Sequence, residues 1–322
     1  MPAPSHTIRV QVTRITPVAS EINLIELTAA HGLELPPFTA GSHIDLHLSN
    51  GMIRSYSLSG SPDEPEHYLI GVKNEPEGRG GSRFIHEQLQ LGDDIEISAP
   101  RNNFGLHEEA DHTVLIAGGI GVTPLVSMSQ RLETIGKPWE LHYAGRHRGS
   151  TAFIPQLSAF GSRVNLYLRN GAEDAAQSRR MDIPAIVEAA PAGSHFYCCG
   201  PAAMINGFLA ATTLLPPDQV HFERFANDQP IDKDGSFTVI LKESGETIEI
   251  RSGQTILDAL LERGIDAPYS CMEGICSACE TRVLAGIPDH HDMILSAEQK
   301  AANNVMMICC SRSKTPELVL AL

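Results

Sequence analysis

The 322-residue sequence contains no apolar run near the roughly 20 residues that span a bilayer. Its first residues also lack the basic-then-apolar order of a secretion signal. Basic residues are few, because 24 Lys and Arg stand against 39 Asp and Glu for a net charge of -15. These shortages argue against binding nucleic acid through its phosphates and predict a cytoplasmic protein without a membrane partner. The acidic balance is either a solubility device or a means of docking to a basic partner.

Cysteine is almost absent from the first two hundred and seventy residues. Cys198 and Cys199 lie in mid-chain, and the other five of the seven fall between Cys271 and Cys310. An odd, clustered set without secretory context disfavours a disulfide framework. Ligation of a metal or a metal cluster is the better explanation.

The pattern of apolar and polar residues along the chain predicts a multidomain β and α/β protein of three modules. Over residues 1–104 apolar and polar positions alternate, which predicts short strands in a closed or nearly closed β-barrel. Over 105–225 continuous apolar strands alternate with helices, which predicts a parallel α/β domain. A polar linker at 226–234 leads to a third module at 235–322, where a hairpin precedes a helix over 254–264. The helix is expected to bury Ile256, Leu257, Leu260 and Leu261 and to end at Gly264.

The third module carries three cysteines at spacings of four and two residues. This is the spacing of plant-type [2Fe–2S] ligands, for which a loop must curl tightly around an inorganic core. Gly274 permits such curling because it has no Cβ. A zinc site and simple buried thiols are the alternatives, but zinc knuckles favour paired short spacings. The three loop ligands would be Cys271, Cys276 and Cys279.

The fourth ligand is either Cys309 or Cys310, since neighbours in a strand point to opposite faces. The stretches 284–292 and 308–314 resemble the C-terminal domain of the phthalate dioxygenase reductase family, and the reductases of vanillate O-demethylase and related Rieske oxygenases look most similar. The resemblance implies a β-grasp ferredoxin domain and assigns the fourth ligand to Cys309. Ser277 departs from the glycine usual in the family, and its side chain is expected to narrow the approach to the cluster.

Two stretches in the first module suggest a flavin site. The strand at 54–57 reads RSYS, which taken alone is equally an ordinary strand with outward polar residues. The turn at 80–82 precedes a helical pattern and leaves backbone amides free for a phosphate. Together they resemble the FMN site of the same family, where the strand lines the isoalloxazine and the turn holds the phosphate. FMN rather than FAD is expected, because no adenine-holding extension is found. The candidate residues are Arg54, Tyr56, Ser57, Gly80, Gly81 and Ser82.

The second module contains GGIGVTP at 118–124, between a strand and a helix, where a phosphate loop would lie. Thr123 is expected to cap the helix and Pro124 to stand in its first turn. Paired with YCCGP at 197–201, the turn is similar to the pyridine-nucleotide domain of ferredoxin-reductase-like enzymes. In those enzymes the Cys-Gly-Pro turn lies beside the nicotinamide, whereas Cys198 is expected to be merely buried. The candidates are Gly119, Gly121, Thr123, Pro124, Cys199, Gly200 and Pro201.

The sequence leaves two questions open: whether the nucleotide is NADH or NADPH, and what Phe225 contacts. The end of the second strand of this module carries Arg146 and Arg148 and no acid, which favours the 2′-phosphate of NADPH. The family favours NADH, and NADH is our prediction because Arg146 can equally bind the pyrophosphate. Phe225 is either a contact of the flavin ring, as in similar enzymes, or part of the core.

The order of the modules predicts a route for electrons. A nicotinamide releases a hydride and an iron–sulfur cluster accepts one electron at a time, so a flavin is needed between them. The family implies that the acceptor is a Rieske-type terminal oxygenase acting on an aromatic or similar small molecule, docked near Met272 and Glu273. Met272 is equally an ordinary loop residue. The alternatives are a standalone ferredoxin-type carrier with an inactive flavin and nucleotide module, and a complete monooxygenase, for which too few residues remain.

Overall fold

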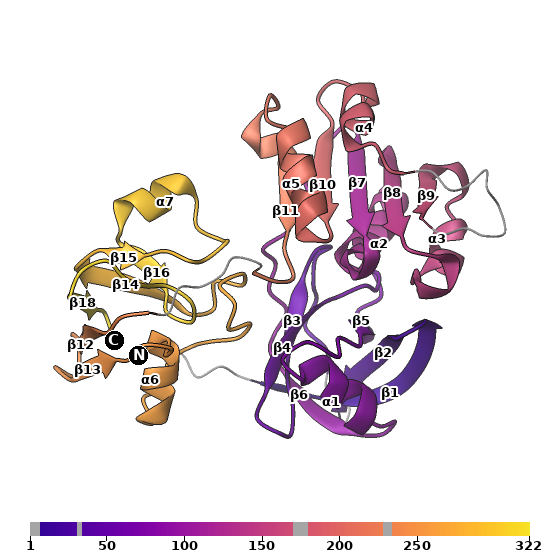
Figure 1. Ribbon diagram of the computed structural model, residues 1–322. Coiled ribbons are helices and arrows are strands. Elements are labelled where there is room, and N and C mark those ends of the chain that lie inside the picture. The colour runs from indigo at the N-terminus through magenta and orange to yellow at the C-terminus, as the bar shows by residue number, and fades with distance from the viewer. Residues whose placement is uncertain (1–6, 31–33, 170–179, 228–233) are drawn as a thin grey trace. The chain divides into compact units, whose positions relative to one another are not determined.

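The computed structural model describes residues 7–30, 34–169, 180–227 and 234–322 (Figure 1). The chain forms two compact units, Met1–Glu223 and Arg224–Leu322. The first two predicted modules therefore share one unit, and the division falls two residues before the predicted end of the second module. Phe225 belongs to the C-terminal unit.

The first unit begins with a six-stranded antiparallel sheet in the order β4-β3-β6-β1-β2-β5. An antiparallel bridge between Leu58 and Ile70 links its two edges, so the sheet closes on itself. Alternate side chains such as Val10 and Val12 fill the interior, which is the pattern that predicted the barrel. The elements are β1 (Ile8–Ala19), β2 (Ile22–Ala29), β3 (His43–His47), β4 (Ile53–Ser57), β5 (His67–Lys73), α1 (Gly81–Gln88) and β6 (Asp94–Ile97).

The second half of this unit is a parallel sheet in the order β11-β10-β7-β8-β9. Helix α2 packs on one face and helices α4 and α5 on the other (Figure 1). The chain reverses its direction of progress between β7 and β10, and ligands of such sheets bind where those strands end. The strands are β7 (Thr113–Gly118), β8 (Trp139–Gly145), β9 (Val164–Leu168), β10 (His195–Cys199) and β11 (Val220–Glu223). The helices are α2 (Val122–Thr134), α3 (Ile154–Ser158), α4 (Ile183–Ala189) and α5 (Ala202–Ala211).

The start of α2 corrects one expectation. A single 3₁₀ turn at Gly119–Gly121 runs directly into the helix, so Gly121 is its N-cap and Thr123 lies within the first turn. The prediction that Thr123 caps the helix was wrong. Its buried hydroxyl instead donates a hydrogen bond to the Ile120 carbonyl at 3.0 Å.

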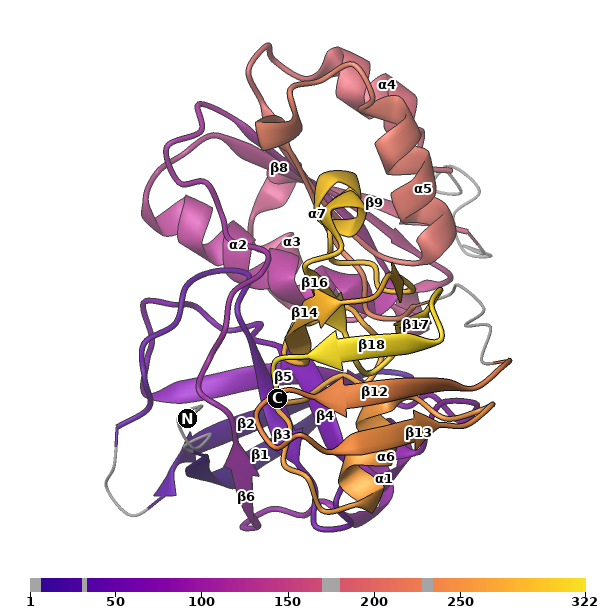
Figure 2. The same cartoon turned by 90° about the vertical axis from the view of Figure 1, so that its left-hand side faces the viewer.

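The C-terminal unit contains a five-stranded mixed sheet in the order β13-β12-β18-β14-β16 and a small second sheet of β15 and β17. The predicted hairpin of β12 and β13 and the helix α6 are confirmed, and α6 packs against the sheet (Figure 2). Leu261 does not join the buried face of α6, because it remains 37% exposed. The elements are β12 (Phe237–Leu241), β13 (Thr247–Ile250), α6 (Ile256–Glu262), β14 (Glu280–Ala285), β15 (Pro288–Asp289), α7 (Ala297–Ala302), β16 (Val305–Met307), β17 (Arg312–Ser313) and β18 (Glu317–Leu320).

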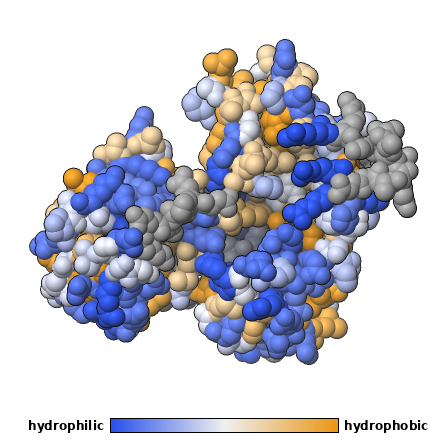
Figure 3. All heavy atoms as spheres, viewed as in Figure 1, coloured by the Kyte–Doolittle hydropathy of each residue, from blue (hydrophilic) through white to orange (hydrophobic). Residues whose placement is uncertain are grey.

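Hydrophilic side chains dominate the face shown in Figure 3, and apolar ones are scattered between them. Within the described parts of the chain, no helix has the length and apolar character needed to cross a bilayer.

Candidate functional site

The two predicted flavin stretches lie against each other. Strand β4 carries Arg54, whose guanidinium donates a hydrogen bond to the Arg79 carbonyl at 2.9 Å. A Cβ on Gly81 would lie 2.3 Å from Arg54 Nε, so any larger residue there would force the Arg54 side chain to move. Residues 25 positions apart in the sequence thus form one surface that combines a fixed cation with the start of a helix.

The amino terminus of α1 has the properties of a phosphate site. Gly80 precedes the helix with φ +82°, in the region that favours glycine, and no side chain caps the first turn. Ser82 Oγ accepts a hydrogen bond from the Glu75 amide at 3.0 Å, which fixes the turn. The first-turn amides and the helix dipole favour an anion here. The residues present therefore fit the phosphate of a flavin.

The other two flavin candidates on β4 are Tyr56 and Ser57. Burial raises the pKa of Tyr56 well above its ordinary value, and the nearby Arg54 opposes the rise. The phenol consequently stays protonated and can donate a hydrogen bond. Ser57 is buried at the end of β4.

The two predicted nucleotide motifs meet at the switch point of the parallel sheet. A Cβ on Gly121 would lie 2.5 Å from the Cys199 carbonyl oxygen and 2.7 Å from the Gly200 nitrogen. A Cβ on Gly200 would lie 3.1 Å from the Cα of Gly118. Backbone therefore packs directly on backbone between the ends of β7 and β10, at the switch point where such sheets bind ligands. We call this contact of Gly118, Gly121 and Gly200 the shelf.

The remaining nucleotide candidates follow the ends of strands β7, β8 and β10. Pro201 directly precedes α5, and Pro124 is buried in the first turn of α2. Gly119 has φ +55°, and its carbonyl accepts a hydrogen bond from the Tyr143 hydroxyl at 3.1 Å. Arg146 is exposed immediately after β8, at the predicted place.

The sequence analysis missed Glu223. It is the register partner of Cys199 on the neighbouring strand β11, so its carboxyl lies beside the nicotinamide candidates. Its Oε2 is buried and has no hydrogen-bond partner in the described residues. Burial raises the pKa of Glu223 to about 8, and burial together with Glu223 raises the pKa of the Cys199 thiol. The signal available in the sequence was an acid at the last position of a short strand, Val220–Glu223.

The predicted cluster ligands converge. The Cys271 thiol interacts with the thiols of Cys276 and Cys309, and the Cys279 thiol interacts with that of Cys309. These interactions lower the pKa of Cys271 and Cys279 and raise that of Cys276 and Cys309. The Glu273 amide also donates to Cys271 Sγ at 3.3 Å, as cluster-binding loops do to stabilise negative sulfur.

The backbone of the loop explains how the thiols converge. Met272, Gly274 and Ser277 all have positive φ, at 57°, 70° and 59°. A Cβ on Gly274 would lie 2.4 Å from Cys310 Sγ and 3.1 Å from the Cα of Asp292. Glycine is thus needed at 274 for space as well as for conformation. The loop therefore curls in the way that a cluster-binding loop requires, and the four cysteines remain the predicted ligands.

The two adjacent cysteines have different surroundings. Cys309 contacts two of the three loop thiols. Cys310 Sγ is 3.8 Å from both the Met307 carbonyl and the Ser311 hydroxyl. This supports Cys309 as the fourth ligand, which remains a prediction.

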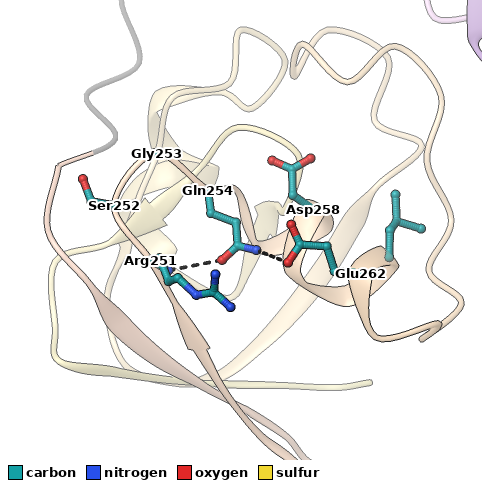
Figure 4. Close-up of a pocket in the computed structure, with 7 residues that line it drawn as sticks. Arg251, Ser252, Gly253, Gln254, Asp258 and Glu262 are labelled. Atoms are coloured by element: carbon teal, nitrogen blue, oxygen red, sulfur yellow. Dashed lines mark hydrogen bonds between the residues drawn. The ribbon is translucent and has the colours of Figure 1, made fainter.

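A separate pocket of about 530 Å³ lies at the start of α6. Figure 4 shows Gln254 at its centre, where its side chain accepts a hydrogen bond from the Arg251 amide and donates one to Glu262 Oε2. None of the predicted site residues lines it.

Comparisons with known proteins agree with this architecture. A family profile described as an oxidoreductase FAD-binding domain matches residues 9–105, and one described as a 2Fe-2S iron-sulfur cluster binding domain matches residues 239–314. The protein is thus a flavin and iron–sulfur oxidoreductase.

Full-length relatives narrow this class. The chain is 50% identical to the phenoxybenzoate dioxygenase subunit beta of Ectopseudomonas oleovorans, over 94% of each chain. It is 46% identical to the tetrachlorobenzoquinone reductase of Sphingobium chlorophenolicum, over 99% of each. It is 40% identical to the vanillate O-demethylase oxidoreductase of Acinetobacter baylyi, over 97% of this chain and 98% of the relative.

A solved structure of phthalate dioxygenase reductase, described as a modular structure for electron transfer from pyridine nucleotides to [2Fe-2S], superposes with a TM-score of 0.79. The identity is 35%, and 98% of each chain is covered. The chain belongs to the phthalate dioxygenase reductase-like family. It is a reductase that passes electrons from a reduced nicotinamide nucleotide through a flavin to a 2Fe-2S cluster, so the alternative of a carrier with an inactive first unit is set aside.

The buried carboxyl predicts a dependence of stability on pH. Because the pKa of Glu223 is raised to about 8 in the folded protein, the folded state loses stability as pH rises from about 4.5 to about 8. We expect Glu223→Gln to be more stable than the parent at pH 8, by roughly 1–3 kcal/mol, and nearly equal at pH 5. Urea unfolding at both values measures this. Glu188→Gln, at an exposed position of α4, is the control, and an equal gain at pH 5 would contradict the prediction.

The contact of Arg54 with the α1 turn predicts a specific loss of flavin. We expect Arg54→Ala to weaken flavin retention by about 10–100-fold, as for the loss of a charged hydrogen bond, and to slow flavin reduction. The visible spectrum after dialysis and stopped-flow reduction measure the two effects. Arg14→Ala removes an equivalent charge at an exposed site of β1, and the cluster signal should persist in both variants. Full flavin content in Arg54→Ala would refute the role.

The surroundings of the adjacent cysteines predict different outcomes for two matched variants. Cys309→Ser should lose or distort the cluster's visible absorption and EPR signal, because a thiolate ligand is replaced. Cys310→Ser should keep both. The reverse pattern would assign the ligand to Cys310.

Proposed function

We propose that this protein is the NADH-dependent, FMN-containing reductase component of an oxygenase system. The external acceptor of its electrons is a Rieske-type terminal oxygenase that acts on an aromatic or similar small molecule. The proposal is supported by a cysteine loop whose positive-φ turns at Met272, Gly274 and Ser277 bring its thiols near Cys309. The first unit of the same chain carries the Arg54 surface and the packed glycines between β7 and β10. The acceptor is inferred from relatives whose names describe dioxygenase and demethylase components.

Each part of the site has a task in this function. Bound FMN would supply the conversion between paired and single electrons. Arg54 would stabilise negative charge on the reduced ring, and the uncapped start of α1 would bind the phosphate. Gly121 and Gly200 would admit the nicotinamide to the shelf, and the Glu273 amide would hold the Cys271 sulfur. No acid, base or nucleophile is required.

FMN is preferred to FAD because the phosphate site at α1 suits a terminal monophosphate. After α1 the chain passes through Leu89 and a short turn directly into β6 (Asp94–Ile97), so this stretch contains no extension that could hold the adenine of FAD. NADH is preferred to NADPH because of the resemblance to the family. The exposed Arg146 does not oppose this choice, because it can bind the pyrophosphate rather than a 2′-phosphate.

The second candidate function is direct reduction of a quinone. The relative of 46% identity over 99% of both chains is named a tetrachlorobenzoquinone reductase. A soluble quinone is a chemically suitable acceptor from either the flavin or the cluster.

An anaerobic titration of the holoprotein tests the proposal. We expect one extractable FMN per chain and reduction of flavin and cluster by NADH well before NADPH, followed by absorbance and EPR. A protein with iron and sulfide but no flavin would refute the proposal. Steady-state rates with Rieske oxygenase components and with substituted benzoquinones then decide between the two acceptors.

A further inference from the structure

A buried carboxyl group lies behind the turn that carries the first predicted cluster ligands. Gly274 stands between Cys271 and Cys276 in the sequence. A Cβ on Gly274 would lie 3.1 Å from the Cα of Asp292 and 3.2 Å from its Cβ. The Met293 amide donates a hydrogen bond to the Gly274 carbonyl at 2.9 Å, which joins the two segments. Asp292 is therefore packed directly against the loop that is predicted to bind the cluster.

The side chain of Asn227 joins the same two segments. Its Nδ2 atom donates one hydrogen bond to the Glu273 carbonyl at 3.1 Å and another to the His291 carbonyl at 2.7 Å. Glu273 directly precedes Gly274, and His291 directly precedes Asp292. All of these residues belong to the C-terminal unit. Two separate sets of hydrogen bonds thus fix the position of Asp292 relative to the cluster-binding loop.

Only one oxygen of the Asp292 carboxylate is used in shaping the chain. Oδ2 accepts hydrogen bonds from the Ile294 amide at 3.3 Å and from the Leu295 amide at 2.9 Å, which fixes the turn that follows. Oδ1 has no hydrogen-bond partner among the described residues, and His290 Nδ1 lies 3.6 Å from it. An asparagine could therefore place its oxygen at Oδ2 and its nitrogen at Oδ1 without changing the turn.

The negative charge of this carboxylate is only partly balanced. Lys300 Nζ lies 3.6 Å from Asp292 Oδ2 and donates a hydrogen bond to the Asp292 carbonyl at 2.5 Å. The Lys300 side chain is 32% exposed, so water screens its charge, whereas the Asp292 side chain has no exposed surface. A charge inside the protein acts on a nearby redox group more strongly than a charge in contact with water.

We propose that the buried carboxylate of Asp292 lowers the reduction potential of the cluster. Reduction adds one electron to a centre that negative thiolates are predicted to bind, and a fixed negative charge beside it makes that addition less favourable. The reduced cluster consequently gives up its electron more readily to the next acceptor. The inference rests on the cluster that the family membership shows, and not on the proposed flavin, nucleotide or acceptor.

Two variants should shift the potential in opposite directions. For unit charges about 10 Å apart at an effective dielectric constant of about 20, Coulomb's law changes an equilibrium constant by roughly tenfold. A tenfold change is about 59 mV for a one-electron couple. We expect Asp292→Asn, which removes the negative charge and keeps the shape, to raise the potential by about that amount. Lys300→Met removes the balancing positive charge and should lower it. The double variant restores the net charge of the parent and should lie between the two.

EPR of the holoprotein during a dithionite titration with redox mediators measures the potential. Dithionite supplies the electrons, so the result does not depend on the choice of nucleotide. All variants are compared at one pH, because a proton taken up by His290 beside Asp292 would change the local charge. Glu298→Gln is the matched control: it removes the same charge from an exposed position of α7 and should leave the potential unchanged. Iron content and the shape of the EPR spectrum should match the parent in every variant.

The outcomes separate an electrostatic role from a structural one. Equal shifts in Asp292→Asn and Glu298→Gln, or shifts of the same direction in Asp292→Asn and Lys300→Met, would overturn the inference. If Asp292→Asn fails to hold iron, Lys300→Met decides alone, and an unchanged or raised potential would overturn it. Loss of iron from both variants would show that the pair is merely structural and would also overturn it. A parent protein without any cluster signal would instead contradict its place in this class of reductase.

Discussion

The tight turns of the cysteine loop are the constraint on which this reductase depends most. Thiols separated by four and two residues can converge only if the backbone reverses repeatedly, and it does so at Met272, Gly274 and Ser277, all with positive φ. For residues with a Cβ, each such turn costs about 1–2 kcal/mol. Ligation by four thiolates offsets strain of that size easily. The resemblance led us to expect glycine at position 277, and glycine would adopt this left-handed conformation without strain, whereas Ser277 is strained there.

Glycines also shape the first unit, because at two places another group lies where a Cβ would otherwise be. Gly81 lets Arg54 lie across the start of α1, and Gly121 lets one strand end pack on the next. At the start of α1 a phosphate is expected to meet main-chain amides with Arg54 beside them, and at the switch point a nicotinamide is expected to meet backbone. A flat ring needs a flat surface, and a phosphate needs free amides. The glycines provide both without any reactive residue.

The sequence predicted what local patterns encode. Alternation gave the strands of the barrel, continuous apolar runs gave β7 and β10, and the spacing of the cysteines gave the cluster loop. It failed at Thr123, because a 3₁₀ turn feeds α2 without a break and places the cap one residue before the helix at Gly121. It also failed at Leu261, which the helical period puts on the apolar face but the sheet does not reach. Both errors concern details that tertiary packing decides.

Glu223 and Asn227 could not be found from the sequence for a deeper reason. Glu223 becomes part of the site only through the register of β10 and β11, which pairs it with Cys199. Asn227 matters only because two carbonyls 18 residues apart, those of Glu273 and His291, are brought together beside it. Neither residue belongs to a motif, since motifs record spacing along one segment and these contacts join several. Residues of this kind are recognised only from the pairing of strands and the folding of loops, which no single stretch of sequence records.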